Sequence, residues 1–182
     1  QQLRDELGRL TYRKTYGSAL RRTIWTLVVV AAAAILCSSF FISVLVVQGS
    51  SMDPTLRDGQ LVLVVKTDSF RSGDIMAFYY NNKILLKRVI GEAGDVVDIS
   101  EDGVVSVDGA ELSEPYVLDK CLGDGDMAFP FEVPDSRWFV LGDRRATSVD
   151  SRWSMIGTVA EEQVIGRVVL RLWPLTDLGI FS

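Results

Sequence analysis

The chain has 182 residues, a formal net charge of −5 and a hydrophobic content of 48%. This length accommodates one modest domain with a core large enough to fold without staples. The acidic balance offers no basic stripe for phosphates, which argues against nucleic-acid binding, and the complete lack of histidine excludes histidine-base catalysis.

The first 22 residues are basic, whereas the rest of the chain is acidic. Six cationic residues against Asp5 and Glu6 give this segment +4, which leaves −9 for the remainder of a chain that totals −5. The cations are Arg4, Arg9, Arg13, Lys14, Arg21 and Arg22.

Residues 24–47 contain no charged side chain. At about 1.5 Å per residue this run spans roughly 36 Å, which predicts a transmembrane helix over residues 23–47. A cleaved signal peptide would have an apolar region of only about 7–15 residues. Because cations favour the cytoplasmic side, residues 1–22 are expected in the cytoplasm and residues 48–182 outside.

The two cysteines are Cys37, inside the apolar run, and Cys121, in the outer region. This topology keeps them apart, and a single outer cysteine cannot build a thiolate zinc cage. We therefore expect no metal and no cofactor.

The outer region reads as a series of short β-strands joined by tight turns. Asp102-Gly103 and Asp108-Gly109 suit two-residue hairpin turns, and residues 119–136 read as an irregular loop. The sequence predicts a mostly antiparallel β domain with strands at residues 60–65, 75–80, 84–90, 96–100, 104–107, 110–112, 137–142 and 166–175.

Two side chains stand out as candidates for chemistry. Ser51 follows the apolar run by four residues, so it lies at most about 14 Å along the chain from the predicted helix end. Lys87 shares a strand face with Leu85 and Val89, and burial on such a face lowers a lysine pKa and frees a neutral amine. A polar turn and a snorkelling surface lysine are the plain alternatives.

Four stretches carry a resemblance that covers essentially the whole chain. In chain order they are GSSMDPTL at 49–56, RSGDIMAF at 71–78, LLKRVIGEAGD at 85–95 and LGDRRATSVDSRWSMIGTV at 141–159. Together they resemble the conserved boxes of the bacterial type I signal peptidases. The resemblance implies a serine endopeptidase in which Ser51 is the nucleophile, Lys87 the general base and Ser148 a hydrogen-bonding partner of the lysine amine.

The same resemblance implies the surroundings of this dyad. The Ser51 backbone N–H would form the oxyanion hole, and Gly49 stands where some members place a helping hydroxyl. An ion network that scaffolds the Ser148 loop, with Arg88 a further candidate, and shallow pockets for small substrate side chains would complete the site. The network residues are Asp143, Arg145, Asp150 and Arg152, and the pocket residues are Met52, Leu86, Val47 and Leu45.

Within the last box, Arg144, Ala146 and Thr147 depart from the asparagine and aspartate types common in the family. With the predicted anchor, the resemblance implies a single-pass enzyme of the bacterial cytoplasmic membrane that cleaves signal peptides from exported preproteins after Ala-X-Ala. The alternatives are a catalytically idle, membrane-anchored β domain that binds precursors, and a specialised or self-cleaving Ser–Lys peptidase.

Overall fold

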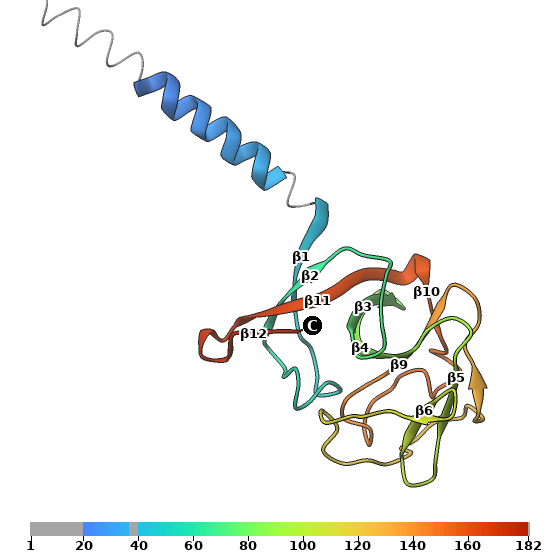
Figure 1. Ribbon diagram of the computed structural model, residues 1–182. Coiled ribbons are helices and arrows are strands. Elements are labelled where there is room, and N and C mark those ends of the chain that lie inside the picture. Colours follow the sequence, from blue (N-terminus) through green and yellow to red (C-terminus); the bar gives the residue numbers. More distant parts are fainter. Residues whose placement is uncertain (1–19, 37–39, 182) are drawn as a thin grey trace, which may run out of the picture. The chain divides into compact units, whose positions relative to one another are not determined.

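The structure, a computed structural model, describes residues 20–36 and 40–181 (Figure 1). The chain divides into two compact units, residues 1–41 and Ile42–Ser182. Cys37 lies outside the described residues.

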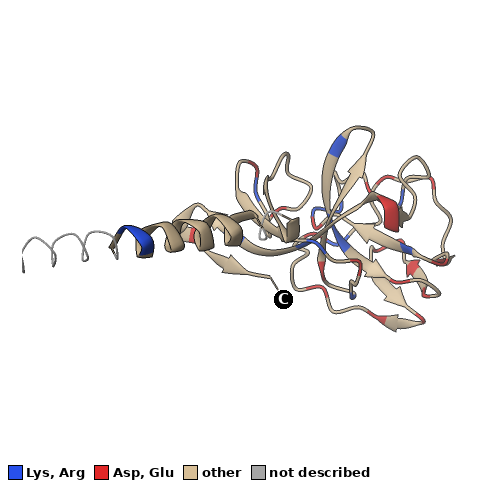
Figure 2. Ribbon diagram, turned by 90° about the horizontal axis from the view of Figure 1, so that it is seen from above, with Lys and Arg blue, Asp and Glu red and all other residues tan. Residues whose placement is uncertain are grey.

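In the first unit, residues 20–36 and 40–41 are helical and their side chains are exposed. Figure 2 shows basic residues at the start of this helix, at Arg21 and Arg22, and no charge along the rest of it. Of the helices that the structure describes, none has both the length and the apolar character needed to cross a membrane.

The second unit consists mainly of an eight-stranded antiparallel sheet in the order β1-β2-β11-β3-β4-β9-β10, with β12 paired to β11. A smaller sheet has the order β7-β6-β5-β8. The prediction of a mostly antiparallel β domain is therefore confirmed. The strands are β1 (Ile42–Val46), β2 (Leu61–Val65), β3 (Ile75–Tyr80), β4 (Lys83–Gly91), β5 (Val96–Ile99), β6 (Val105–Val107), β7 (Ala110–Glu111), β8 (Phe131–Glu132), β9 (Arg137–Leu141), β10 (Val159–Ala160), β11 (Val164–Trp173) and β12 (Gly179–Ile180), with 3-10 turns η1 (Glu161–Gln163) and η2 (Leu175–Asp177).

The predicted helix over residues 23–47 needs correction at its C-terminal end, because residues 42–46 form strand β1. This strand pairs with β2 over five residues, from Ile42 opposite Val65 to Val46 opposite Leu61. Leu45 in this strand and Val47 directly after it pack on the core. Charge-free sequence satisfies a helix and a buried strand equally well, so the pairing partner decides between them.

The hairpin predictions are confirmed in part. Asp108 and Gly109 both have positive φ, 52° and 78°, and join β6 to β7 as a two-residue turn. Residues 100–104, however, form a longer connection in which the Ser100 carbonyl accepts from Gly103 N–H and the Val104 carbonyl accepts from Ser100 N–H. The loop predicted over residues 119–136 also contains the short strand β8.

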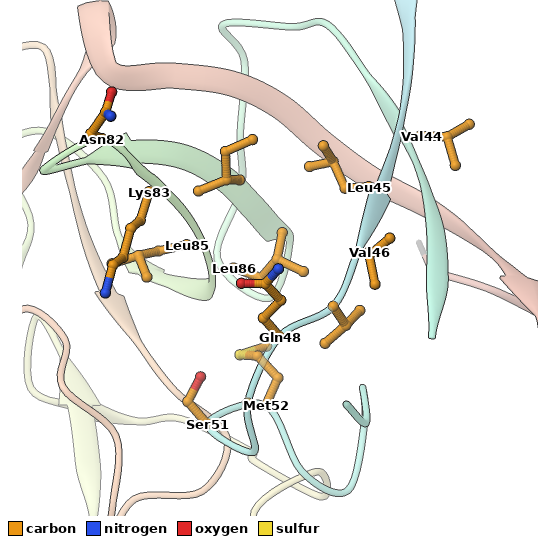
Figure 3. A pocket seen from close by; sticks show the side chains of 13 residues that line it. Val44, Leu45, Val46, Gln48, Ser51, Met52, Asn82, Lys83, Leu85 and Leu86 are labelled. Atoms are coloured by element: carbon orange, nitrogen blue, oxygen red, sulfur yellow. The ribbon is translucent and has the colours of Figure 1, made fainter. Parts of the chain in front are cut away.

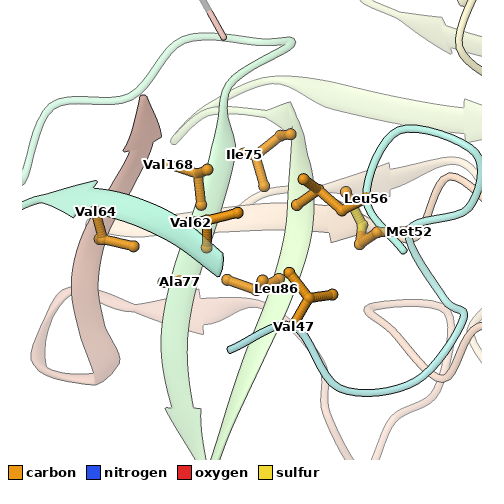
Figure 4. Packing of buried hydrophobic residues seen from close by; sticks show 9 residues of the cluster. All are labelled: Val47, Met52, Leu56, Val62, Val64, Ile75, Ala77, Leu86 and Val168. Atoms are coloured by element: carbon orange, nitrogen blue, oxygen red, sulfur yellow. The ribbon is translucent and has the colours of Figure 1, made fainter. Parts of the chain in front are cut away.

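One of three core clusters joins the turn after β1 to the large sheet (Figure 4). Met52 and Leu56, on either side of a short turn, are 2% and 0% exposed and pack with Val62, Ile75 and Leu86. The Leu56 N–H donates to the Met52 carbonyl over 2.8 Å, which closes the turn. The core therefore holds the segment that carries Ser51.

Candidate active site

Ser51 lies in a half-buried position on the tight turn that follows β1. Gly49 begins this turn with φ of +82°, a conformation that glycine adopts without strain, and its N–H donates to Asp58 Oδ1 over 2.7 Å. Buried Met52 comes directly after Ser51, whereas Ser50 is exposed. The turn thus fixes the backbone of Ser51 and leaves its side chain at the surface of a pocket.

Lys87 lies in the middle of β4 and is only 3% exposed. Its Nζ donates to Ser148 Oγ over 2.9 Å, and Ser148 is itself buried. Burial lowers the pKa of Lys87 from 10.5 to about 8; Arg152 also lowers the pKa, whereas Asp150 and Asp143 oppose the change. A substantial fraction of this amine is therefore neutral near pH 8 and can accept a proton.

Gly142 lies between the serine turn and the loop residue Ser148. A Cβ at this position would lie 2.1 Å from Ser148 Oγ and 2.7 Å from the Ser51 carbonyl oxygen, so only glycine fits here. The Ser51 carbonyl also accepts from Arg144 N–H over 3.0 Å. Although Lys87 donates to Ser148 and no hydrogen bond joins Ser51 Oγ to another described residue, Ser51 and Ser148 flank the same glycine.

Four of the predicted scaffold residues form two buried ion pairs, Arg88 with Asp143 and Arg152 with Asp150. Arg88 grips Asp143 through two hydrogen bonds of 2.8 and 2.6 Å, and Thr55 Oγ1 donates to the same carboxylate over 2.5 Å. Arg152 binds Asp150 over 2.8 and 2.9 Å. A planar guanidinium paired in this two-pronged way resists rotation, so both pairs hold the ends of the 142–152 loop.

Several carbonyl and amide groups of this loop complete the second ion pair. Asp150 Oδ2 accepts from Gly142 N–H over 2.9 Å. Arg152 Nη2 donates to the carbonyls of Arg145 over 2.8 Å and Ser148 over 3.2 Å. The loop that carries Ser148 is thereby tied to its own ion pair at both ends.

Arg145 has a different partner, which our sequence analysis missed. It forms a buried ion pair with Glu114, a residue from the connection between β7 and β8. Tyr116 O–H donates to Glu114 Oε1 over 3.2 Å, and its ring lies 3.8 Å from the Arg88 guanidinium carbon. The available signal was an imbalance among the scaffold candidates, because their three arginines have only two carboxylates, Asp143 and Asp150, to pair with.

A pocket of about 430 Å³ opens beside Ser51 (Figure 3). Its walls are the end of β1 with the residues that follow it and the start of β4. The four predicted pocket residues all line it together with Ser51: Leu45, Val47, Met52 and Leu86. Val47, Met52 and Leu86 also belong to the hydrophobic core, so these side chains serve packing and pocket shape at once.

The backbone N–H of Ser51 donates to no other residue in the described part of the chain, which leaves it available to an oxygen atom in the pocket. Gly49 lines the same pocket, and a Cβ at Gly49 would meet nothing within 4 Å. The site therefore has one free backbone donor next to Ser51.

The loop residues that depart from the family types line a different pocket from Ser51. Arg144 is exposed and pairs with Asp53 over 3.4 Å. Arg144 and Asp53, together with Ala146 and Thr147, line a second pocket of about 410 Å³. Among the residues that the structure describes, no cluster of acidic or thiol side chains is arranged to hold a metal ion.

Comparisons with known proteins agree on one family. The family model "Signal peptidase, peptidase S26" matches residues 20–173. "Signal peptidase I" of Bacillus amyloliquefaciens is 32% identical over 163 residues, covering 84% of this chain and 87% of its own. "Signal peptidase IB" of Staphylococcus aureus is 34% identical over 176 residues, covering 84% and 90%. A crystal structure of a signal peptidase I from Enterococcus faecalis is 29% identical, with a TM-score of 0.46 over 54% of this chain and 96% of that one.

Proposed function

The chain belongs to the type I signal peptidase family, peptidase S26, and is a serine endopeptidase that cleaves signal peptides from preproteins; we propose that it does so with Ser51 as nucleophile and Lys87 as general base. The observation that carries this assignment is a lysine, 3% exposed and with its pKa lowered to about 8, that donates to Ser148, and Ser148 lies against the same glycine as the Ser51 carbonyl. In a chain without histidine, a neutral lysine amine is the base best suited to activate a serine.

Acylation begins when neutral Lys87 takes the proton from Ser51 Oγ as this oxygen attacks the scissile carbonyl carbon. The negative charge that develops on the carbonyl oxygen is stabilised by the free N–H of Ser51. Lys87 then gives its proton to the departing amine, which is the new N-terminus of the mature protein. A water molecule, deprotonated by Lys87, hydrolyses the remaining ester and regenerates the Ser51 hydroxyl.

Ser148 has the role of orienting the amine of Lys87. Its Oγ accepts a hydrogen bond from Nζ at 2.9 Å and so aims the amine, which would otherwise rotate freely on a four-carbon stem. Asp143, Arg145, Asp150 and Arg152 act one step further away, because they hold the backbone of the loop that carries Ser148.

The pocket beside Ser51 supports cleavage after small side chains. Its apolar lining from Leu45, Val47, Met52 and Leu86 leaves shallow space, and its walls run along two strands. An extended signal-peptide segment with alanines at the first and third positions before the cut would lie between β1 and β4 and present alternate side chains to this lining.

We place the enzyme at the bacterial cytoplasmic membrane, with a single anchor formed by the charge-free run up to residue 41 and with residues 1–22 in the cytoplasm. The catalytic unit adds an apolar sheet face that supports contact with the bilayer. Register aligns Val46, Leu61 and Trp173 in one row across β1, β2 and β11, and Val44, Leu63, Leu170 and Ile180 in the next. Val44, Val46, Trp173 and Ile180 are each more than half exposed.

Other aromatic residues do not belong to this face. Phe129 and Phe131 pack against Phe139 in the second core cluster, and Trp153 is half-buried. A membrane contact would therefore involve β1, β11 and β12 rather than the loops around residue 130.

The assignment is tested with a preprotein that carries an Ala-X-Ala junction, incubated in detergent with the wild type and the Ser51→Ala, Lys87→Ala and Ser50→Ala proteins. Mass spectrometry should find one cut after the second alanine, lost with the first two variants and kept with Ser50→Ala. Normal cleavage by Lys87→Ala would disprove the dyad. A wild-type protein that is folded but does not cut the preprotein would favour the idle β domain. Conversion of the enzyme itself into smaller fragments during incubation would favour self-cleavage.

A further inference from the structure

The buried charges around the active site balance only when one residue outside the motifs is counted. Among the described residues, the buried ionisable side chains are Lys87, three arginines and three carboxylates. Each arginine has its own carboxylate: Arg88 with Asp143, Arg152 with Asp150, and Arg145 with Glu114. With Lys87 neutral, as the reaction requires, the cluster is electrically neutral, and without Glu114 it carries one uncompensated buried cation.

Glu114 is connected to the reacting groups through Arg145. The Arg145 Nε donates to the Gly142 carbonyl over 3.1 Å, and Gly142 is the residue that touches both Ser148 Oγ and the Ser51 carbonyl. The carbonyl of Arg145 accepts from Arg152, so its backbone is held as well. A shift of the Arg145 guanidinium would therefore move the glycine on which the spacing of Ser51 and Ser148 depends.

A second contact links the same segment to the other end of the site. Tyr116, two residues after Glu114, covers the guanidinium of Arg88, which grips Asp143. Burial raises the pKa of Tyr116, so its hydroxyl remains protonated and donates to Glu114. Residues 114 and 116 thus reach two of the three buried arginines.

The Glu114–Arg145 pair is poorly explained by stability alone. Glu114 Oε2 and Arg145 Nη1 are both buried and have no hydrogen-bond partner among the described residues. Buried ion pairs of this kind contribute little net stability, and apolar replacements of similar volume are often neutral. What an apolar pair could not replace is the hydrogen bond from Arg145 to the Gly142 carbonyl.

We propose that Glu114 is a positioning residue for signal-peptide cleavage, which holds Arg145 on the Gly142 carbonyl and thereby sets the placement of Ser51 relative to Lys87 and Ser148. The inference rests on the proposed Ser51–Lys87 mechanism. It predicts that loss of the Glu114 charge slows acylation and leaves substrate binding intact, because Glu114 is not among the residues that line the pocket.

The test compares Glu114→Gln, which keeps shape and an acceptor oxygen, with Glu111→Gln as the matched control. Glu111 is exposed and makes only a 3.6 Å pair with Lys120. With a signal-peptide substrate, we expect Glu114→Gln to lower kcat about tenfold or more with KM within twofold, and Glu111→Gln to match the wild type. A covalent serine probe should still titrate Ser51 completely in Glu114→Gln, but more slowly.

Wild-type kcat in folded Glu114→Gln would overturn the proposal. The proposal would also fail if kcat fell only in proportion to the fraction of molecules whose Ser51 reacts with the probe. If Glu114→Gln does not fold, the double variant Glu114→Leu, Arg145→Met decides. We expect it to unfold near the wild-type temperature with kcat at least tenfold lower, and full activity would refute the role. Inactivity of the wild type and of Glu111→Gln would instead reject the mechanism on which the inference rests.

Discussion

Lys87 shows how one residue combines a catalytic advantage with a cost in stability. Its side chain is almost fully buried, and its amine has one hydrogen-bond acceptor, Ser148 Oγ. Burial favours the neutral form, which is the form that would accept the serine proton in the proposed mechanism. The same burial penalises the folded state at every pH at which the unfolded lysine is charged.

At the residue scale, the pH dependence of cleavage should report this amine. With a pKa of about 8, the neutral fraction of Lys87 falls about tenfold for each pH unit below 8 and levels off above it. We therefore expect kcat/KM for a signal-peptide substrate to rise with pH up to about 8 and then become flat. A rate that is independent of pH between 6 and 8 would contradict Lys87 as the base.

The stability cost makes a separate prediction. Because the pKa of Lys87 is about 8 in the folded protein and 10.5 when unperturbed, the unfolded state binds the extra proton between these values. The cost is fully present below pH 8 and disappears as pH rises to about 10.5; it amounts to about 3 kcal/mol. We expect Lys87→Met to be inactive but more stable at pH 7.

Denaturant unfolding of both proteins across this range measures the difference. The Lys87→Met advantage in the free energy of unfolding should reach up to about 3 kcal/mol near pH 7 and shrink towards pH 10.5. If Lys87→Met were less stable than the wild type at pH 7, burial of the charged lysine would not cost the folded state free energy.

At the scale of elements, β1 is the strand on which both the core and the pocket depend. It pairs with β2 along its full length, and the residues from Val44 to Gly49 line one wall of the pocket beside Ser51. Leu45 in this strand and Val47 directly after it pack with Val62 and Val64 in the first core cluster. The catalytic unit therefore begins at residue 42.

Two truncated proteins test this boundary. A protein of residues 42–182 should fold and cleave a soluble signal-peptide substrate, because it contains the whole second unit. A protein of residues 48–182 lacks β1, exposes its core and loses a pocket wall, so we expect at least a hundredfold lower kcat/KM. Equal activity of the two proteins would mean that β1 is dispensable.

Most strands follow from local sequence, since alternating β-branched residues and turn pairs such as Asp108-Gly109 carry their own signal. Residues 42–46 and 131–132 did not, for two reasons, and the two-residue strands β10 and β12 were not predicted either. The first segment has the composition of a membrane helix and becomes a strand only through its pairing with β2. The second is two residues long and becomes a strand only through its pairing with β5.

At the scale of the whole molecule, one face of the sheet packs on the core and the other face exposes apolar side chains. Residues 45, 47, 62 and 64 point into the core, whereas their neighbours Val44, Val46, Leu61 and Leu63 form the apolar outer face with Trp173 and Ile180. An exposed apolar row of this kind is typical of an interaction with a membrane or a partner. It adjoins the strands that bound the pocket, which suits a substrate that is itself held in the bilayer.

The prediction for this face concerns membrane binding of the 42–182 protein. Replacement of Trp173 and Ile180 by serine should weaken its binding to lipid vesicles roughly tenfold or more, since each large apolar side chain contributes about 1–2 kcal/mol on burial. Leu118→Ser serves as control, because Leu118 is 74% exposed but lies outside the face. Equal vesicle binding by all three proteins would argue against this contact.

The candidate chemistry of this protein follows from local features of the chain. The absence of histidine, a serine at the start of a tight turn and a lysine in an apolar strand are local facts, and the order of four motifs linked them to one family. They predicted Ser51, Lys87 and Ser148, of which the structure joins the last two by a hydrogen bond.

Only the folded structure shows which strands and which charged side chains, far apart in the chain, pair with each other. It turned residues 42–46 from a predicted helix into a wall of the pocket, and it supplied Glu114 as the third buried carboxylate. Neither could be read locally, because a strand is defined by the strand beside it, and a buried charge by the opposite charge that folding brings within reach.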